Sequence, residues 1–342
     1  MSCATELDPT VEEVEARIAK VEQLVAAGAT IEELALAIRA VHRGCTIQMA
    51  GLRRGDLLFR ARRITERPTN RSQVSYPRAE TLNVFGRAND IRQAMFYACT
   101  ANQHPDRDHD NMIACLWESG AESGQVFAIG TWQVEEDIPL YPFGFHADAI
   151  LNSPVNQKSG RATDPVINAG SPRDALLVIK RWESAAFTKS VPAGEESLYK
   201  FTVALTKYAL DFRWPVGSAG PGPHDRVSGI MYPSVANRLC VENVCLRPEE
   251  ADRVLTLLGV TILSPSDMTE FDLSNRSSVE EPIGMAQVTL FGSSLPCNRS
   301  HDIRWPLRVV LSSEFDVDNN TMSAGSHLHV WSNTLPLSKP TK

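Results

Sequence analysis

The sequence lacks the short motifs that most directly identify nucleotide, metal or acyl-transfer chemistry. It has neither G-x-x-x-x-G-K-[S/T] nor G-x-G-x-x-G, so it indicates neither a P-loop nor a Rossmann phosphate-binding turn. It has no C-x-x-C pair, which argues against a zinc site of the usual kind. No G-x-S-x-G elbow surrounds Ser234, so this serine is not marked as an acyl-transfer nucleophile.

Long apolar segments and secretion features are also missing. The longest apolar runs, such as Ala175–Ile179, are far too short to span a bilayer, so we expect no membrane insertion. The N-terminus has no basic region followed by an apolar one, so we expect no signal peptide. The seven cysteines are scattered and odd in number, which favours buried thiols over a disulfide framework. These features predict a cytoplasmic protein.

Charge and composition fit an ordinary globular chain. With 342 residues, 43% of them hydrophobic and 22% charged, the chain can build one large domain or two ordinary ones. The net charge of −7 argues against a nucleic-acid partner, which would require a basic face.

Residues 10–43 are predicted to form a helical hairpin. Thr10 with Glu13, and Thr30 with Glu33, each form a possible capping box, and Gly28 separates the two apolar-periodic segments. The apolar stripe of this hairpin either packs on the main domain or forms a surface for a partner or a second copy of the chain.

After residue 55 short apolar segments alternate with polar loops. We predict helices at 112–119 and from about Ser171 to Ser184. We predict a further helix or turn that begins at Pro248, because the first turn of a helix tolerates proline. The predicted strands are Asp56–Arg62, Gln93–Cys99, Gln125–Trp132, Ile138–Leu140, Tyr199–Leu210, Gly229–Tyr232, Asn243–Leu246, Met285–Phe291 and Ile303–Leu311.

Three arginines stand out as candidate phosphate ligands. Arg60 and Arg62 lie at a strand end, and Arg87 lies in the turn Gly86–Asn89. A guanidinium presents a rigid set of donors that matches two phosphate oxygens at once. The alternative for each arginine is a surface ion pair.

An aromatic hydroxyl and a carboxylate follow these arginines. Tyr97 ends an apolar strand, so its hydroxyl needs a partner, either a ligand or another group of the core. Glu118 closes an apolar helical segment, and a carboxylate there could stabilise positive charge that develops on a sugar. Glu122 competes with Glu118 for this role, and a helix-surface glutamate is the alternative for both.

The remaining candidates are a serine and two sets of metal-like residues. Ser234 could hydrogen-bond a ribose or an amide, or it could be a turn serine that bonds only its own backbone. The acidic residues 106, 108 and 110 are spaced as in a calcium loop, but Asn111 and Trp117 occupy its glycine and glutamate positions. His327 and His329 have no evident third ligand. We therefore predict no metal.

In order along the chain, these residues match a known pattern. The chain resembles the RES-domain family, named for an arginine, a glutamate and a serine, over roughly residues 55 to 260. The matching motifs are Phe59-Arg60, Gly86-Arg87-Ala88-Asn89, Phe96-Tyr97, Glu118, Tyr232-Pro233-Ser234 and Asn243-Val244-Cys245-Leu246-Arg247-Pro248-Glu249. Two positions depart from the pattern: Ala88 stands where an aromatic residue is frequent, and Arg92 where glycine is common.

The resemblance implies a fold and a domain organisation. It implies an α+β fold with an ADP-ribosyltransferase-like mixed core of two small, mainly antiparallel sheets around an NAD cleft. Helices flank this core, and the N-terminal hairpin is additional. We accordingly expect an N-terminal helical segment at 1–54, a RES-like catalytic domain at 55–260, and a β-rich extension packed on the core at 261–342.

The resemblance also implies an activity. Arg60 and Arg87 would hold the phosphates of NAD, Tyr97 would contact the nicotinamide half, Glu118 would act at the scissile bond and Ser234 at the nicotinamide riboside. The expected reaction is NAD cleavage by hydrolysis or phosphorolysis, with NAD as substrate. The alternatives are transfer of ADP-ribose to a macromolecule and non-catalytic binding of NAD or ADP-ribose. Expected partners are an antitoxin or immunity protein and, through the N-terminal helices, a second copy of the chain.

Overall fold

A computed structural model gives the structure of the protein. It describes the following residues: 9–45, 49–100, 112, 115–143, 173–189, 191–192, 194–213, 226–233, 242–269, 285–293, 303, 310–311, 314–316, 321–323 and 328–329.

Two helices open the described chain, α1 (Val11–Ala26) and α2 (Ile31–Val41). Both predicted capping boxes are confirmed: Thr10 and Glu13 bond each other's backbone N–H groups, as do Thr30 and Glu33. Gly28 ends α1 with a φ of +74°, a left-handed conformation that glycine adopts without steric cost.

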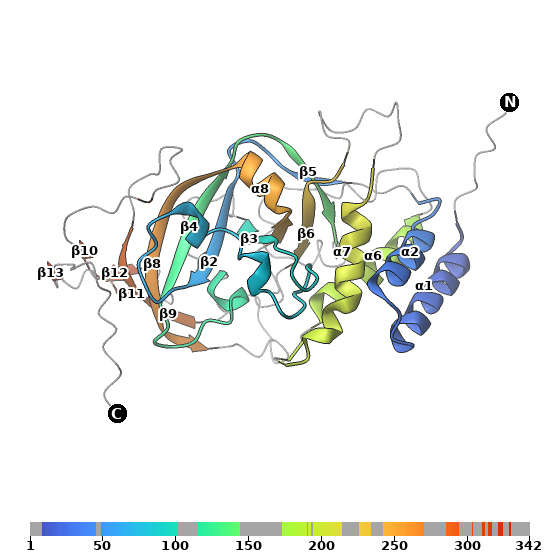
Figure 1. The fold of residues 1–342 in the computed structure, drawn as a ribbon, viewed down its shortest axis with the longest axis horizontal. Helices are drawn as coiled ribbons and strands as arrows, with labels where there is room; N and C mark the ends of the chain where they lie inside the picture. Colours follow the sequence, from blue (N-terminus) through green and yellow to red (C-terminus); the bar gives the residue numbers. More distant parts are fainter. Residues whose placement is uncertain are drawn as a thin grey trace.

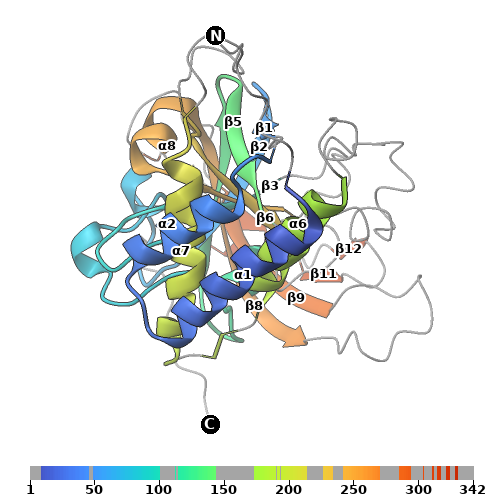
Figure 2. The same ribbon diagram turned by 90° about the vertical axis from the view of Figure 1, so that its right-hand side faces the viewer.

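The hairpin formed by α1 and α2 packs on the main domain. Its buried stripe includes Val14, Val21 and Ile38, which share one hydrophobic cluster with Tyr141 of the sheet and Leu205 of a later helix. Figures 1 and 2 show α1 and α2 beside α6 and α7 at one end of the molecule, on one side of the strands. Burying this stripe is what stabilises two helices of this length, because isolated helices this short are marginal in water.

Most of the described strands join one mixed sheet of eleven strands, in the order β1-β5-β6-β7-β3-β2-β4-β8-β9-β11-β12. Neighbours are antiparallel except β5 and β6, which are parallel. β10 and β13 form a separate pair. The strands are β1 (Ala50–Leu52), β2 (Leu57–Arg63), β3 (Phe96–Thr100), β4 (Phe127–Val134), β5 (Ile138–Pro142), β6 (Gly229–Pro233), β7 (Glu242–Leu246), β8 (Leu255–Thr269), β9 (Met285–Ser293), β10 (Val310–Leu311), β11 (Glu314–Asp316), β12 (Thr321–Ser323) and β13 (Leu328–His329).

This sheet has two halves that meet at a short junction. β2 and β3 pair at only two positions, Leu58 with Thr100 and Phe59 with Cys99. Beyond Phe59, β2 continues along β4 while β3 pairs with β7. The chain is therefore α+β, as predicted. The predicted pair of small sheets differs from the described strands, which form one continuous ladder through this narrow junction.

The later helices are α6 (Arg173–Thr188), α7 (Lys200–Leu210) and the short α8 (Pro248–Val254), and a 3₁₀ turn, η4 (Glu196–Tyr199), precedes α7. Of these helices, α6 and α7 pack on β6, whereas α8 packs on β8. The helix predicted to reach Ser184 is confirmed over its described part, and α8 begins with Pro248 as predicted.

The predicted strand at Tyr199–Leu210 is wrong, because this segment forms η4 and α7. Its apolar alternation resembled a strand because α7 is buried on nearly all sides, so no polar helical face interrupts the pattern. The hydroxyls of Thr202 and Thr206 are buried and donate to the carbonyls of Tyr199 and Thr202. Such bonding hides polar side chains inside a helix.

The C-terminal part of the described chain extends the sheet. β8 pairs with β4 on one edge and with β9 on the other, so the boundary expected between 260 and 261 falls inside β8. The strand predicted at Met285–Phe291 is confirmed as β9, whereas most of Ile303–Leu311 lies outside the described residues. No helix in the described ranges has the length and apolar character needed to cross a membrane.

Candidate functional site

The candidate site lies where β3, β7 and β6 run next to the junction between the two halves. Residues in register on neighbouring strands share a face. Tyr97 is in register with Cys245, and Asn243 is in register with both Cys99 and Tyr232. These five side chains therefore line one face of three adjacent strands.

The turn at Gly86–Asn89 is closed by Tyr97. The Tyr97 hydroxyl donates to Asn89 Oδ1 at 2.7 Å and accepts from the Ala88 N–H at 2.9 Å. A Cβ on Gly86 would overlap Asn89 Oδ1, so this position requires glycine for close approach. Burial raises the pKa of Tyr97 well above its ordinary value, so the phenol stays neutral and keeps its proton for Asn89.

Arg92 follows this turn in a conformation that glycine normally supplies. Its φ is +59°, and its N–H donates to the carbonyl of Leu82 at 2.9 Å. An arginine in the left-handed region is uncommon. The backbone at Arg92 therefore adopts a bend that glycine would adopt at lower cost.

Arg87 is anchored to the end of α6. Its Nη1 donates to the carbonyls of Phe187 and Lys189, the latter at 3.1 Å, and its Nη2 donates to the Tyr199 hydroxyl at 3.3 Å. The guanidinium also lies 5.1 Å from the centroid of the Tyr199 ring. The carbonyls at a helix C-terminus carry partial negative charge, so they hold a cation without neutralising it.

Arg60 lies at the junction, on the first β2 position beyond the pairing with β3. Its side chain is buried; Nε donates to the Ser75 carbonyl at 3.0 Å, Nη1 donates to the Tyr97 carbonyl, and the guanidinium stacks on Phe96. Burial, with a smaller contribution from Arg62, lowers the pKa of Arg60 to about 10, so the group stays charged at neutral pH.

Within the described part of the chain, neither Arg60 nor Arg87 forms an ion pair with a carboxylate. Their printed partners are carbonyls and one hydroxyl. The surface ion pair considered for each arginine is thus not what these residues form. Arg60 is buried and Arg87 is half-buried, and a cation removed from water without a counter-ion is costly, so both groups suit an anionic ligand.

Glu118 acts electrostatically on the same wall of the site. Burial raises the pKa of Tyr232 well above its ordinary value, and nearby Tyr97, Cys245 and Glu118 add to the effect. Glu118 also contributes to the raised pKa of Cys99, behind the larger effects of Cys115 and burial. Arg87 opposes the shift at Tyr232. The helical turn that carries Glu118 packs on Cys99 through Cys115 and Leu116, on the face of β3 that Tyr97 shares.

Glu118 and Glu122 occupy different settings. Glu118 is half-buried at the end of a helical turn at 115–118. Glu122 is exposed and accepts a hydrogen bond from Gln125 Nε2 at 2.6 Å.

Several predicted residues cannot be compared with the structure. Ser234 lies outside the described residues, although β6 carries the chain to Pro233 immediately before it. The acidic run at 106–110 and His327 also lie outside them. Among the side chains that the structure does describe, no group of three or more His, Cys, Asp or Glu residues is arranged to hold a metal ion.

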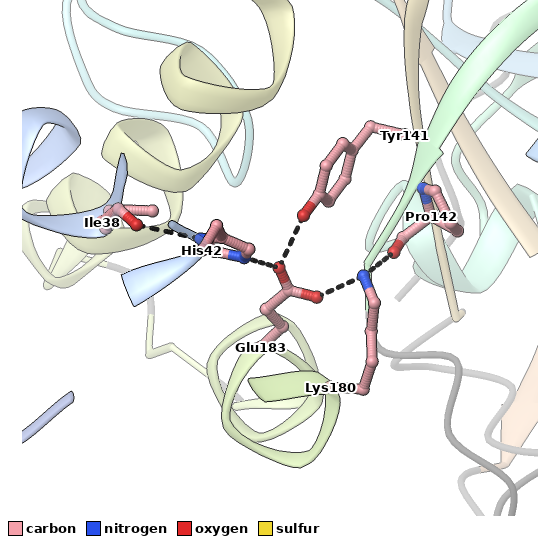
Figure 3. A network of polar contacts seen from close by, with 6 residues as sticks. All are labelled: Ile38, His42, Tyr141, Pro142, Lys180 and Glu183. Carbon is pink, nitrogen blue, oxygen red and sulfur yellow. Dashed lines mark hydrogen bonds and ion pairs between the residues drawn. The ribbon is translucent and has the colours of Figure 1, made fainter. Parts of the chain in front are cut away.

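A second polar cluster was missed by the sequence reasoning, and it lies in the helical half of the molecule (Figure 3). Buried Glu183 accepts from Lys180 Nζ through Oε2 at 2.7 Å. Its other oxygen, Oε1, accepts from the Tyr141 hydroxyl at 3.0 Å and lies 2.8 Å from His42 Nε2. Lys180 also donates to the Pro142 carbonyl at 2.9 Å. The sequence signal for this cluster is the i,i+3 pair of opposite charges, Lys180 and Glu183, in α6.

Glu183 is held in its charged form by the groups around it. Burial alone would raise the pKa of Glu183, but Lys180 and His42 outweigh it and hold that pKa below its ordinary value. His42 Nδ1 lies 2.9 Å from the Ile38 carbonyl, which can only accept. With an ionised carboxylate at Nε2, a ring that satisfies both partners donates from both nitrogens.

Comparison with known proteins adds no assignment. The chain matches no protein-family model, no curated protein and no solved structure.

Proposed function

We propose that the chain binds NAD+ and cleaves its nicotinamide–ribose bond. The observation that carries the proposal is the pair of sheltered guanidinium groups, Arg60 and Arg87, whose described partners are carbonyls and a hydroxyl. A bound diphosphate would supply the missing negative charge, and arginine is the side chain best shaped to bind it. Two of the five N–H groups of Arg60 are used to fix the guanidinium, which leaves others for phosphate oxygens.

The second half of the proposal concerns the scissile bond. As the C1′–N bond between ribose and nicotinamide breaks, its electron pair leaves with nicotinamide and the sugar becomes oxocarbenium-like. The carboxylate of Glu118 would stabilise this positive charge, because charge placed where charge develops lowers the barrier. Water then forms the new C1′–O bond and loses a proton, which yields ADP-ribose and nicotinamide.

The electrostatic neighbourhood favours Glu118 over Glu122 for this role. Glu118 is half-buried and contributes to the raised pKa values of Tyr232 and Cys99, which line the candidate site. Glu122 is exposed and engaged with Gln125. Tyr97, whose hydroxyl is committed to Asn89 and Ala88, would act by fixing the turn that presents Arg87.

The arrangement of the sheet supports an ADP-ribosyltransferase-like core. The two halves of the sheet separate at the junction of β2 and β3, and Arg60 lies at that point. The resemblance to the RES-domain family implies a dinucleotide cleft between two sheets, and this junction is where such a cleft would open. An antitoxin or immunity partner and self-association through α1 and α2 belong to the same proposal.

The test is to incubate the purified full-length chain with NAD+ and measure free nicotinamide and the second product. We expect nicotinamide release by the wild type and a loss of roughly 100-fold or more in Glu118→Gln. Glu122→Gln, which changes a nearby carboxylate in the same way, should retain activity.

Product identity separates the possible acceptors. Free ADP-ribose indicates water, ADP-ribose 1″-phosphate indicates phosphate, and label retained on protein or nucleic acid indicates ADP-ribosyl transfer. Equal rates in Glu118→Gln and wild type would contradict the catalytic assignment. NAD+ binding without any nicotinamide release would leave a binding protein and reject the enzyme.

A further inference from the structure

Asn243 occupies the centre of the candidate site's wall. It lies on β7, in register with Cys99 on β3 and with Tyr232 on β6. Its side chain is 4% exposed. Asn243 belongs to one of the motifs that resemble the RES-domain pattern, but that resemblance implies no role for it.

The amide of Asn243 is only half satisfied. Cys99 Sγ donates to Asn243 Oδ1 at 3.3 Å, whereas Asn243 Nδ2 is buried and has no hydrogen-bond partner. Exchanging the two amide atoms would place the NH2 group against a weak sulfur acceptor and leave the carbonyl oxygen without a donor. Either orientation leaves one polar end of this amide unmet, and a buried unmet donor costs free energy.

Other buried polar atoms in the described chain are also unmet. Trp132 Nε1 lies in the apolar cluster that contains Phe96, on the opposite face of β3 from Tyr97, and Ser75 Oγ belongs to the residue whose carbonyl accepts from Arg60 Nε. Trp117 Nε1 lies in the helical turn that carries Glu118. Both cross-strand neighbours of Asn243 have pKa values that the charge of Glu118 helps to raise. The helical turn that carries Glu118 packs on Cys99 through Cys115 and Leu116, so the unmet donor of Asn243 lies next to the strand position that this turn covers.

The charge of Glu118 restricts what this donor can bind. An anionic acceptor in this position would be repelled by the carboxylate, whereas a neutral carbonyl oxygen would not. In NAD+, the neutral carbonyl nearest the nicotinamide–ribose bond is that of the nicotinamide carboxamide.

We propose that Asn243 is a specificity residue that recognises the nicotinamide carboxamide, with its Nδ2 donating to the carboxamide oxygen. This inference rests on the proposed function, since it assigns a ligand group of NAD+ to a residue of the candidate site. The Cys99 thiol holds the amide in place through Oδ1 and leaves Nδ2 directed to the ligand. The protein would then recognise the nicotinamide leaving group as well as the diphosphate.

The test uses inhibition of NAD+ cleavage by three pyridines on the full-length chain. Nicotinamide has the carbonyl oxygen and the NH2 group, 3-acetylpyridine keeps only the carbonyl oxygen, and pyridine has neither. In the wild type we expect nicotinamide and 3-acetylpyridine to inhibit about tenfold more strongly than pyridine, the value of one hydrogen bond that satisfies a buried donor.

Two variants isolate the donor. Asn243→Leu fills a similar volume without a donor, and Asn243→Asp keeps an acceptor for Cys99 while replacing the donor with an acceptor. Both should bring the three inhibition constants within about twofold of one another. Trp132→Phe removes an unmet buried N–H on the opposite face of β3 and should keep the wild-type ratios. Thermal unfolding of each variant establishes that it is folded.

The outcomes separate this inference from the proposed function. Cleavage of NAD+ by the wild type with no preference for nicotinamide over pyridine, or a preference that Asn243→Leu retains, overturns the role of Asn243 and leaves the enzyme intact. Inhibition by 3-acetylpyridine as weak as that by pyridine overturns the donor-to-carbonyl contact. A wild type that neither binds nor cleaves NAD+ rejects the proposed function, and this inference falls with it.

Discussion

The two buried polar regions of this molecule are built differently. Around Glu183, each charged group has an opposite charge beside it, and Tyr141 completes the hydrogen bonding (Figure 3). Around the junction of β2 and β3, Arg60 is held by carbonyls, and on the nearby wall Asn243 Nδ2 has no partner.

This difference separates structural polarity from candidate function. A closed network ties α2, α6 and β5 together, and none of its side-chain atoms is among the unmet buried polar atoms of the described chain. An open set of donors is unfavourable for folding by itself, so its presence indicates that something else completes it. The four predictions below test this distinction, in order of decreasing expected effect.

The largest effect should come from opening the closed network. Glu183→Ala would leave Lys180 and His42 buried without their carboxylate, and we expect a loss of about 3–5 kcal/mol in the free energy of unfolding. Urea denaturation measures it. Asp211→Ala, which removes an exposed carboxylate 3.7 Å from Lys207, is the control and should cost less than about 1 kcal/mol. Similar losses of unfolding free energy in the two variants would show that burial of the network adds nothing to the cost of removing a carboxylate.

Arg60 should behave in the opposite way. Arg60→Met removes a buried cation without a described carboxylate partner and keeps most of the volume, so we expect a change in unfolding free energy of no more than about 2 kcal/mol. The wild type should be stabilised by added pyrophosphate or ADP-ribose, by about 2.7 kcal/mol at a ligand concentration 100 times the dissociation constant. Arg60→Met should lose this stabilisation. Equal ligand effects on the two proteins would remove Arg60 from the anion site.

The turn that presents Arg87 should tolerate no side chain at Gly86. Gly86→Ala places a Cβ against Asn89 Oδ1, which accepts from Tyr97, and we expect a loss of roughly 1–3 kcal/mol. Tyr97→Phe removes the hydroxyl that holds Asn89. Because both changes break the same contact, the double variant should lose less than the sum of the two single losses. Additive losses would place the strain elsewhere.

The smallest effect is a pH dependence. The pKa of Glu183 is lower in the folded protein than its ordinary value of 4.5, so the unfolded chain binds more protons as the pH falls. The stability due to this carboxylate is therefore present above pH 4.5 and is lost as the pH falls through the folded pKa. The difference in unfolding free energy between wild type and Glu183→Gln should shrink over that range. A constant difference would mean that Glu183 does not titrate there.

Local features were predictable from the sequence because they depend on neighbouring residues. The capping boxes at Thr10 and Thr30 and the end of α1 at Gly28 need only a few consecutive residues to satisfy backbone groups. Strands such as β2 and β7 were found because they are short and bounded by polar turns.

The prediction at Tyr199–Leu210 shows where local patterns become ambiguous. A helix enclosed on all sides loses the polar face that marks its period, and only its position between α2 and the sheet explains the composition. The candidate site, too, was predictable from the sequence only in part. Residue types nominated Arg60, Arg87, Tyr97 and Glu118, but they did not reveal what each guanidinium contacts or that Asn243 has an unmet donor.

By itself, the sequence determined the secondary-structure elements whose stabilising contacts are close along the chain, and it nominated the residue types for a dinucleotide site. Only the tertiary structure decided which polar groups find partners, because those partners come from segments far apart in sequence. His42 and Glu183 are separated by 141 positions and meet, whereas Arg60 and Arg87 meet carbonyls, one hydroxyl and, among the described residues, no carboxylate. Burial makes this difference in free energy large. The difference distinguishes a network whose polar groups are satisfied within the fold from a set of groups that we propose to bind a ligand.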